Sequence, residues 1–343
     1  MNKTIVGFLQ YSLSKEQWLS ENTSMSWLRI LELLSKLGYE THAVCEENSG
    51  GSYCEHNGVK YHFLPRSTKP EIWINKIEKL SPNLLFVNNC PTPWHTGEVL
   101  TKYFKNKGVK QVLRNHFEPS TAFRNSKDHT TLIPNNVDHI ISSFDIHYDF
   151  LSKNFHIENQ NFSHCPFCIN TFVEPIPNSE KDFDFMSSSC PTRSLKNGEL
   201  VTEVFDILKS DGYTAINPHS INRQDFHNYL KRGKVFYFPS LTEGTGRSLL
   251  EAVAFGQTPV VDSFCQTTCY IAKQFGGFYI DSGSKTDSFK NLGHSKSPRA
   301  IANELIEILK KHNAKKDNPK SLSKFDISFE ISRVASILIE NLK

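Results

Sequence analysis

The part of the sequence best suited to chemistry is a glycine-rich loop with a glutamate before it and another in the helix that follows. In residues 236–261, an apolar run is followed by Glu243, by Gly244 and Gly246, and by a helical pattern that contains Glu251. The glycines allow a close approach of the backbone, and the free N–H groups and dipole at the start of the helix suit a phosphate. Carboxylates on either side of this helix start accept hydrogen bonds from sugar or ribose hydroxyls. The segment predicts a site for a phosphorylated, hydroxyl-rich ligand.

Each glutamate taken alone has a simpler interpretation. Glu243 would cap the following helix, and Glu251 would be a solvated surface residue. We favour the ligand site because the strand, the glycines, both glutamates and the helix occur together in one segment.

The same segment resembles the Glu-x7-Glu signature of the retaining glycosyltransferases of family 4 and their relatives. The resemblance includes the Pro-Ser that ends the strand, Glu-Gly-x-Gly, the Ser-Leu-Leu-Glu-Ala helix and the Gly-x-x-Pro-Val-Val that follows. It implies that Glu243 contacts the donor sugar and that Glu251 holds the ribose hydroxyls of the nucleotide. It also implies that the backbone of Gly244, Thr245 and Gly246 lies near the diphosphate, and that the anomeric configuration is retained.

Three further residues fit the family pattern less tightly. The run Gln111-Val-Leu-Arg-Asn-His116 resembles a strand end that presents a histidine to the donor sugar, which makes His116 a candidate catalytic residue. The alternative is a hydrogen-bonded loop histidine. Lys196 resembles the phosphate-binding lysine of the family, and Arg193 is expected to replace an arginine that usually lies further upstream. Two such cations would neutralise a diphosphate leaving group, whereas the alternative is a pair of exposed basic residues.

The elements that must position these residues follow the alternation of βαβ units. The first half predicts strands over 4–9, 40–45, 59–64, 83–88, 109–114 and 137–142. It also predicts a helix over 25–37, with Trp27, Ile30, Leu31, Leu34 and Leu37 at helical spacing. After a linker expected over 161–179, strands are predicted over 183–187, 213–217, 234–238 and 259–262. Helices are predicted over 196–210, 226–231, 247–255 and 329–342.

These two series, with the resemblance, predict an α/β protein of the GT-B type, in which two Rossmann-like domains face each other across a cleft. A length of 343 residues fits two domains. Residues 1–165 would form an acceptor-side domain, and residues 166–325 a domain that binds the nucleotide sugar. The helix within residues 326–343 would pack back toward the N-terminal domain.

Composition narrows the choice of partner and location. The net charge is +3 without a concentrated basic run, which argues against a nucleic-acid partner. No stretch approaches the ~20 apolar residues that span a bilayer, and the N-terminal apolar run is too short for a signal peptide. We expect a cytoplasmic protein, and leave open a peripheral contact with the inner face of the membrane.

Two patterns resemble metal sites. Cys165 and Cys168 have redox or zinc spacing, but the other close cysteine pair lies too far along the chain for a zinc ribbon, so buried thiols are expected. Asp182 and Asp184 have the spacing of metal-dependent glycosyltransferases of another fold, yet they open a predicted strand and are expected at its solvated edge. We therefore expect no metal and no cofactor, with the nucleotide sugar as co-substrate.

The expected activity is sugar transfer to a hydroxyl acceptor of unknown identity, in the synthesis of glycans or cell-surface polysaccharides. One alternative is a degenerate, non-catalytic member that keeps the fold as a binding module. Another is a glycosyltransferase that modifies a base in DNA. The intact Glu243, Gly244, Gly246 and Glu251 argue against the first, and the low net charge gives no support to the second.

Overall fold

The structure is a computed structural model of the chain. It describes residues 3–9, 26–47, 52–65, 69–88, 94–115, 136–149, 152, 162–166, 168–169, 176–192, 196–219, 221–241, 243–283, 285–286, 292–313, 322 and 325–343. These residues fall into two compact units. The first holds the described residues through Pro166 and those from Ile327 onward, and the second holds those from Cys168 through Asp326. The sequence analysis expected boundaries after residues 165 and 325.

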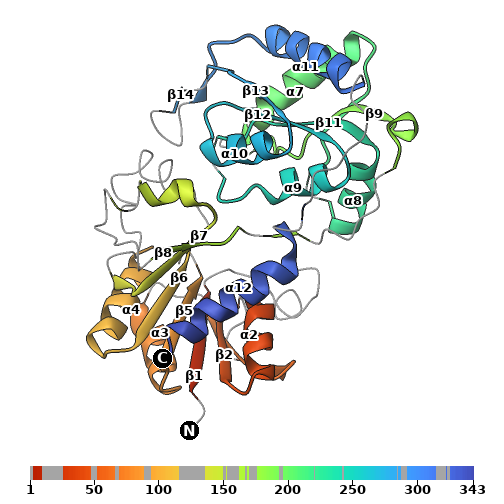
Figure 1. Ribbon diagram of the computed structural model, residues 1–343. Coiled ribbons are helices and arrows are strands. Elements are labelled where there is room, and N and C mark those ends of the chain that lie inside the picture. The colour runs from red at the N-terminus through yellow and green to blue at the C-terminus, as the bar shows by residue number, and fades with distance from the viewer. Residues whose placement is uncertain are drawn as a thin grey trace. The chain divides into compact units, whose positions relative to one another are not determined.

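The first unit contains an eight-stranded sheet in the order β3-β4-β2-β1-β5-β6-β7-β8 (Figure 1). Its strands are β1 (Thr4–Leu9), β2 (Glu40–Glu47), β3 (Tyr53–His56), β4 (Val59–Pro65), β5 (Leu84–Asn88), β6 (Lys110–Arg114), β7 (His139–Ser142) and β8 (Phe162–His164). All neighbouring strands are parallel except β3 and β4, which form an antiparallel hairpin. The chain runs outward from β1 in both directions, which is the doubly wound arrangement of a Rossmann-like domain.

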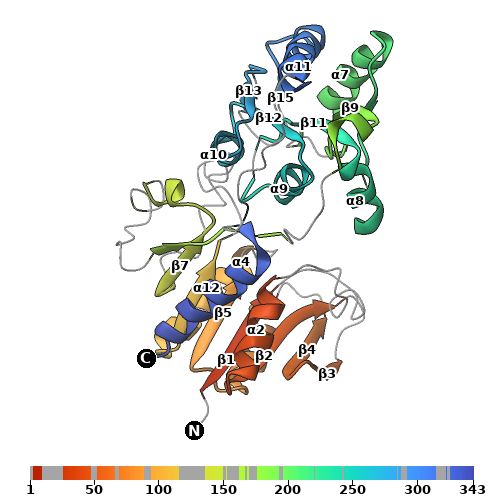
Figure 2. The same ribbon diagram turned by 45° about the vertical axis from the view of Figure 1, so that its right-hand side comes forward.

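Helices cover both faces of this sheet. They are α2 (Ser26–Lys36), α3 (Pro70–Glu78), α4 (Trp94–Asn106) and α12 (Ile327–Glu340). Figure 2 shows α2 and α12 side by side, and their apolar faces share one core, in which Leu31 and Leu338 are fully buried. On the opposite face, Phe8 of β1 meets Trp73 of α3 edge to face, with 5.1 Å between ring centroids. The sheet is therefore buried on both sides, as a parallel sheet requires.

A buried ion pair ties α12 to the end of β6. Nη2 of Arg114 lies 2.9 Å from Oε1 of Glu330, and the two side chains are 1% and 0% exposed. The same carboxylate oxygen accepts a hydrogen bond from the hydroxyl of Ser26 at 2.5 Å. Arg114 also donates to the carbonyl oxygen of Pro166 at 3.1 Å. These bonds join the last helix, the first helix and the strand that leads toward His116.

The second unit contains a five-stranded parallel sheet in the order β10-β9-β11-β12-β13. Its strands are β9 (Phe183–Met186), β10 (Ala215–Ile216), β11 (Gly233–Phe238), β12 (Thr258–Asp262) and β13 (Phe278–Ile280), and a separate hairpin joins β14 (Lys285–Thr286) to β15 (Leu292–Gly293). The helices are α7 (Gly198–Ser210), α8 (Arg223–Lys231), α9 (Arg247–Ala254), α10 (Gln266–Gln274) and α11 (Pro298–Asn313). Figure 1 shows α7 and α11 on one face and α8, α9 and α10 on the other.

The α/β class and the two Rossmann-like sheets are confirmed, and two local expectations are wrong. Leu37 is 56% exposed, because α2 ends at Lys36 and the chain turns at Gly38 with a φ of +92°. The expected linker is also too long at its start. Phe162–His164 form β8, which pairs with β7 in the first unit.

Candidate functional site

The candidate site in the second unit lies where the order of the strands in the sheet reverses. From β9 the chain proceeds outward to β10, whereas from β11, the other neighbour of β9, it proceeds outward to β12. Ligands of such sheets bind beyond the carboxyl ends of the strands at this switch point. Lys196 follows β9, and Glu243 follows β11. The topology thus brings together two residues that the sequence assigned to the same ligand.

Lys196 and Glu243 form an ion pair. Nζ of Lys196 contacts Oε1 of Glu243 and lies 3.2 Å from the hydroxyl oxygen of Ser240, at the end of β11. The same ammonium lies 6.0 Å from the centroid of the Phe238 ring. The side chains of Lys196 and Glu243 are 27% and 15% exposed, so both remain partly open to solvent. A cation and a carboxylate are therefore held side by side at the edge of the sheet.

The loop after β11 leads into α9 through a residue with a left-handed backbone conformation. Gly246 is the N-cap of α9 with a φ of +69°, a conformation that glycine adopts at little cost. Gly244 is half-buried and Thr245 is buried, so the loop lies against the body of the unit. Glu243 is not the N-cap, which removes the simpler interpretation of this residue. No side chain of the cap residue bonds the first amides of α9, and their role toward a phosphate stays a prediction.

Helix α9 is fixed at its other end by a lysine. Nζ of Lys181 donates to the carbonyl oxygen of Phe255 at 3.3 Å and to that of Gly256 at 2.8 Å. A cation at this end satisfies carbonyls that lack helical partners and complements the helix dipole. The contact holds in place the helix that carries Glu251.

Glu251 is buried and paired with two residues of α8. Its side chain is 5% exposed, so it is not a solvated surface residue. Nη2 of Arg223 contacts Oε1 of Glu251, and Nε2 of His227 lies 3.4 Å from the same oxygen. A buried carboxylate requires such partners, since an unpaired charge would be expelled from an apolar environment.

Burial sets the charge states around Glu251. It lowers the pKa of His227, and the nearby Arg223 and Lys231 lower it further, so His227 is neutral at pH 7. Burial, with the neighbouring Arg247, also lowers the pKa of Arg223, but a guanidinium stays charged at neutral pH. Arg223 thus supplies the positive charge that balances Glu251, and His227 supplies a hydrogen-bonding group.

Two predicted site residues, His116 and Arg193, lie outside the described residues, and their assigned roles stay predictions. The chain is described as far as Asn115, whose N–H donates to the carbonyl oxygen of Ile141 at 2.8 Å. Of the other predicted residues, the structure brings Lys196 beside Glu243 and places Gly244, Thr245 and Gly246 between Glu243 and α9. Glu251 lies on α9 with its own partners.

Sequence reasoning missed Arg223 and His227. Their spacing of i and i+4 places both on one face of α8, and this is the signal that could have found them. Asn222 caps the helix, since its side-chain oxygen accepts a hydrogen bond from the N–H of Asp225 at 2.9 Å. What the sequence could not show is that this face meets Glu251, which is distant along the chain.

Of the two patterns that resembled metal sites, the acidic one forms ion pairs and the cysteine pair is buried. Oδ2 of Asp182 lies 2.5 Å from Nε of Arg232, and Oδ1 of Asp184 lies 2.9 Å from Nζ of Lys234. Cys165 and Cys168 are buried thiols outside any disulfide among the described residues, as expected. Within the described ranges, no group of three or more His, Cys, Asp or Glu residues could hold a metal ion. No helix among the described residues is long and apolar enough to cross a membrane.

Part of the second unit matches a known family. Residues 216–318 match the model described as Glycosyl transferases group 1. This group 1 segment includes Arg223, Glu243 and Glu251. A curated relative, the UDP-Gal:alpha-D-GlcNAc-diphosphoundecaprenol alpha-1,3-galactosyltransferase of Escherichia coli, is 28% identical over 118 residues. That match covers 34% of this chain and only 28% of the relative.

Solved structures resemble the chain over its whole length. Sucrose-phosphate synthase from Thermosynechococcus elongatus has a TM-score of 0.70 at 12% identity and covers 99% of both chains. The Anabaena protein HepE, solved in complex with UDP and glucose, has a TM-score of 0.65 at 10% identity and covers 99% of this chain and 100% of its own. At such low identity the likeness shows the fold alone, and that fold is the GT-B fold of glycosyltransferases.

Proposed function

We propose that this protein transfers a sugar from a nucleotide-diphosphate donor to a hydroxyl acceptor, with retention of the anomeric configuration. The observation that carries the proposal is the pairing of two carboxylates with two cations in the group 1 segment and its neighbouring loop. Glu243 is paired with Lys196, and Glu251 with Arg223. The first pair lies at the switch point of the second sheet, where a nucleotide is expected, and the second pair joins the helices α8 and α9.

Each pair has a role in this proposal. Glu251 accepts hydrogen bonds from the ribose hydroxyls, and Glu243 from hydroxyls of the donor sugar. Lys196 turns from Glu243 to the diphosphate and, with the first amides of α9, stabilises the charge that develops on the leaving group. Arg193 would add a second cation, and His116 would line the donor-sugar site. The intact pairs favour an active enzyme over a degenerate binding module.

The proposed reaction needs no metal, because Lys196 and the start of α9 supply the positive charge that a metal would otherwise provide. We propose a UDP-sugar as the donor, since HepE was solved with UDP and the curated relative uses UDP-Gal. The product would be a glycan or cell-surface polysaccharide; the curated relative, by its name, acts on alpha-D-GlcNAc-diphosphoundecaprenol. We place the reaction in the cytoplasm, with peripheral contact at the inner membrane face for an acceptor held there.

Donor hydrolysis tests this proposal without a known acceptor. The protein is incubated with UDP-galactose, UDP-glucose or GDP-mannose, with and without EDTA, and nucleotide release is followed. Proton NMR of the first sugar released reads its anomeric configuration before mutarotation. The proposal expects release from a UDP-sugar, insensitivity to EDTA and an α-sugar from an α-donor. A β-sugar would refute retention, and abolition by EDTA would refute metal independence. A folded protein that neither binds nor hydrolyses any of these donors would support the binding-module alternative.

A further inference from the structure

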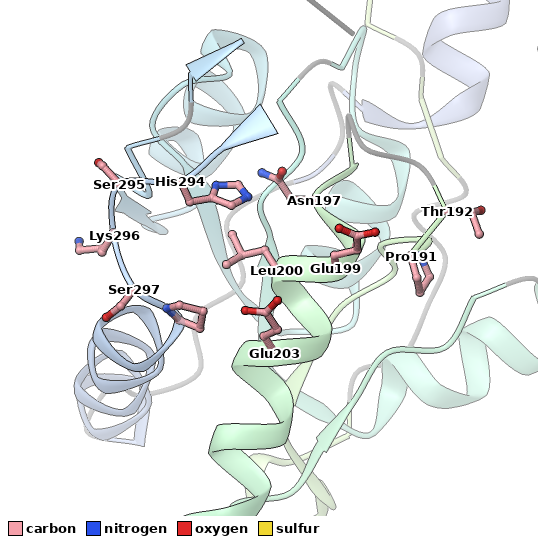
Figure 3. A pocket seen from close by; sticks show the side chains of 12 residues that line it. Pro191, Thr192, Asn197, Glu199, Leu200, Glu203, His294, Ser295, Lys296 and Ser297 are labelled. Atoms are coloured by element: carbon pink, nitrogen blue, oxygen red, sulfur yellow. The ribbon is translucent and has the colours of Figure 1, made fainter. Parts of the chain in front are cut away.

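A cavity lies in the second unit, between α7 and the segment that precedes α11 (Figure 3). Its volume is about 610 Å³, which falls within the ~300–1,000 Å³ of small-molecule sites. Asn197, Glu199, Leu200 and Glu203 line it from the start of α7, and His294 and Lys296 line it from the other side. Among the described residues, those that line it include neither Glu243 nor Glu251, nor their cationic partners. The described lining residues are therefore different from those that form the two ion pairs.

One buried side chain beside this cavity uses only its nitrogen in a hydrogen bond. Asn197 is 3% exposed, and its Nδ2 donates to the carbonyl oxygen of Pro239 at 2.8 Å. Its Oδ1 is buried and has no hydrogen-bond partner among the described residues. Figure 3 shows the side-chain amide across from the His294 ring. Leaving a buried acceptor without a donor costs about 1–3 kcal/mol, and a ligand would recover this energy only after the side chain turns this oxygen toward the cavity.

The charges in the cavity favour a ligand rich in donors. Glu199 and Glu203 lie one turn apart on α7, and Figure 3 shows both carboxylates on the cavity side of the helix. Lys296, the one lysine among the described lining residues, is paired with Glu304. Burial lowers the pKa of His294, although Asp262 and Glu203 oppose this, so the imidazole is neutral at pH 7. These features disfavour phosphates and carboxylates as ligands.

Apolar groups complete the lining. The buried Leu200 and the rings of Pro191 and Pro298 present hydrocarbon to the cavity. A pyranose combines hydroxyl donors on its rim with C–H groups on its faces, so it can satisfy Asn197 and the glutamates while covering these apolar surfaces. We propose that this cavity binds a saccharide of one or two rings, at a second carbohydrate site distinct from the donor site.

Saturation-transfer NMR and calorimetry on the full chain test this proposal. The probes are methyl α-glucopyranoside, N-acetylglucosamine, maltose and lactose, with spermidine as a cationic comparison. One variant, Glu199→Ala/Glu203→Ala, removes both carboxylates, and a second, Glu203→Trp, fills part of the cavity. The matched control is Asp206→Ala, which removes an exposed carboxylate from the same helix outside the cavity. UDP-sugar binding is measured in parallel for every variant.

The proposal expects at least one saccharide to bind the wild type and the Asp206→Ala control equally. The double variant and Glu203→Trp should weaken that binding by about tenfold or more, since two charge-assisted hydrogen bonds or the space itself are lost. UDP-sugar binding should be unchanged in all variants. The proposal is overturned if no saccharide binds, if both cavity variants bind it as tightly as the wild type, or if spermidine binds and the saccharides do not. Loss of UDP-sugar binding alone would count against the donor site and not against this one.

Discussion

The ammonium of Lys196 contacts the carboxylate of Glu243, although 46 residues lie between them in the sequence. The two residues meet because they follow the carboxyl ends of the neighbouring strands β9 and β11. Each side chain balances the other's charge. Under the proposed function, a donor diphosphate would compete with Glu243 for Lys196, and the donor sugar would take over hydrogen bonds at Glu243. The pair would then link the binding of the donor to the placement of the charge that assists the departure of the diphosphate.

Replacement of Lys196 tests its proposed role in leaving-group stabilisation. Lys196→Met should lower kcat about 10²–10³-fold, the usual loss when one group that stabilises a developing anion is removed. Initial rates of UDP release measure the effect. Lys234→Met is the matched control, because Lys234 also pairs with a carboxylate, Asp184, at the opposite end of the sheet. Equal rates in Lys196→Met and the control would remove the lysine from the mechanism.

Arg223 is predicted to hold Glu251 for the ribose. Arg223→Met leaves a buried carboxylate with His227 alone, so the dissociation constant for the donor should rise about tenfold while kcat changes little. Calorimetry with UDP and a UDP-sugar measures this. Arg232→Met, at the end of the same helix and paired with Asp182, is the control. If donor affinity is the same in both variants, Arg223 does not act through Glu251.

Gly198 is predicted to set the position of the loop that carries Lys196. A Cβ at this position would lie 2.2 Å from the carbonyl oxygen of Cys190, so Gly198→Ala must push the start of α7 away from that loop. Donor affinity should fall in this variant. Gly212→Ala, at the end of α7, is the control, because its φ is +88° but nothing lies near the added methyl. It should cost about 1 kcal/mol or more of stability and leave donor binding intact. Equal donor affinity in the two variants would contradict the prediction.

Two buried histidines predict acid sensitivity. Burial lowers the pKa of His62 and of His147 from 6.5 to about 4, and the nearby Lys76 adds to the effect at His62. The folded state binds fewer protons than the unfolded state between these values. Stability is therefore complete above pH 6.5, falls as the pH drops toward 4 and then levels off, with a loss on the order of 3 kcal/mol for each histidine.

Urea unfolding at pH 7, 5.5 and 4.5 measures this loss. His147→Gln should make the dependence on pH shallower, because it removes a neutral buried imidazole that accepts or donates at Ser142. His219→Gln, on an exposed loop, should leave the dependence unchanged. A pH dependence as steep in His147→Gln as in the wild type would show that another group is responsible.

Local patterns predicted the elements that build the site. The strands at 234–238 and 259–262 and the helix at 247–255 were placed within a residue or two of β11, β12 and α9, because continuous apolar runs and glycine boundaries identify buried parallel strands. The prediction of a linker was wrong at Phe162–His164, because this three-residue strand depends on pairing with β7. Its own side chains give no signal strong enough to distinguish it from a loop.

The chemistry of the site was predictable only where it is local. Glu243, Gly246 and Glu251 fall in one short segment, and their types and spacing carry the signal. Their partners lie far away in the sequence. Arg223 of α8 contacts Glu251 of α9, and Asn197, after β9, donates to Pro239, after the neighbouring strand β11. Such pairings are set by the order of strands in the sheet, which the periodicity of a sequence does not specify.

Calorimetric titration of a UDP-sugar into the wild type and Glu251→Gln, with UDP alone as a second ligand, tests whether Glu251 holds the nucleotide. We expect saturable binding of both ligands to the wild type. Glu251→Gln, with its fold verified by circular dichroism, should weaken both by about tenfold or more, since a carboxylate forms stronger hydrogen bonds with hydroxyls than an amide does. Binding of equal strength in the two proteins would contradict the assignment of Glu251, and with it the donor site.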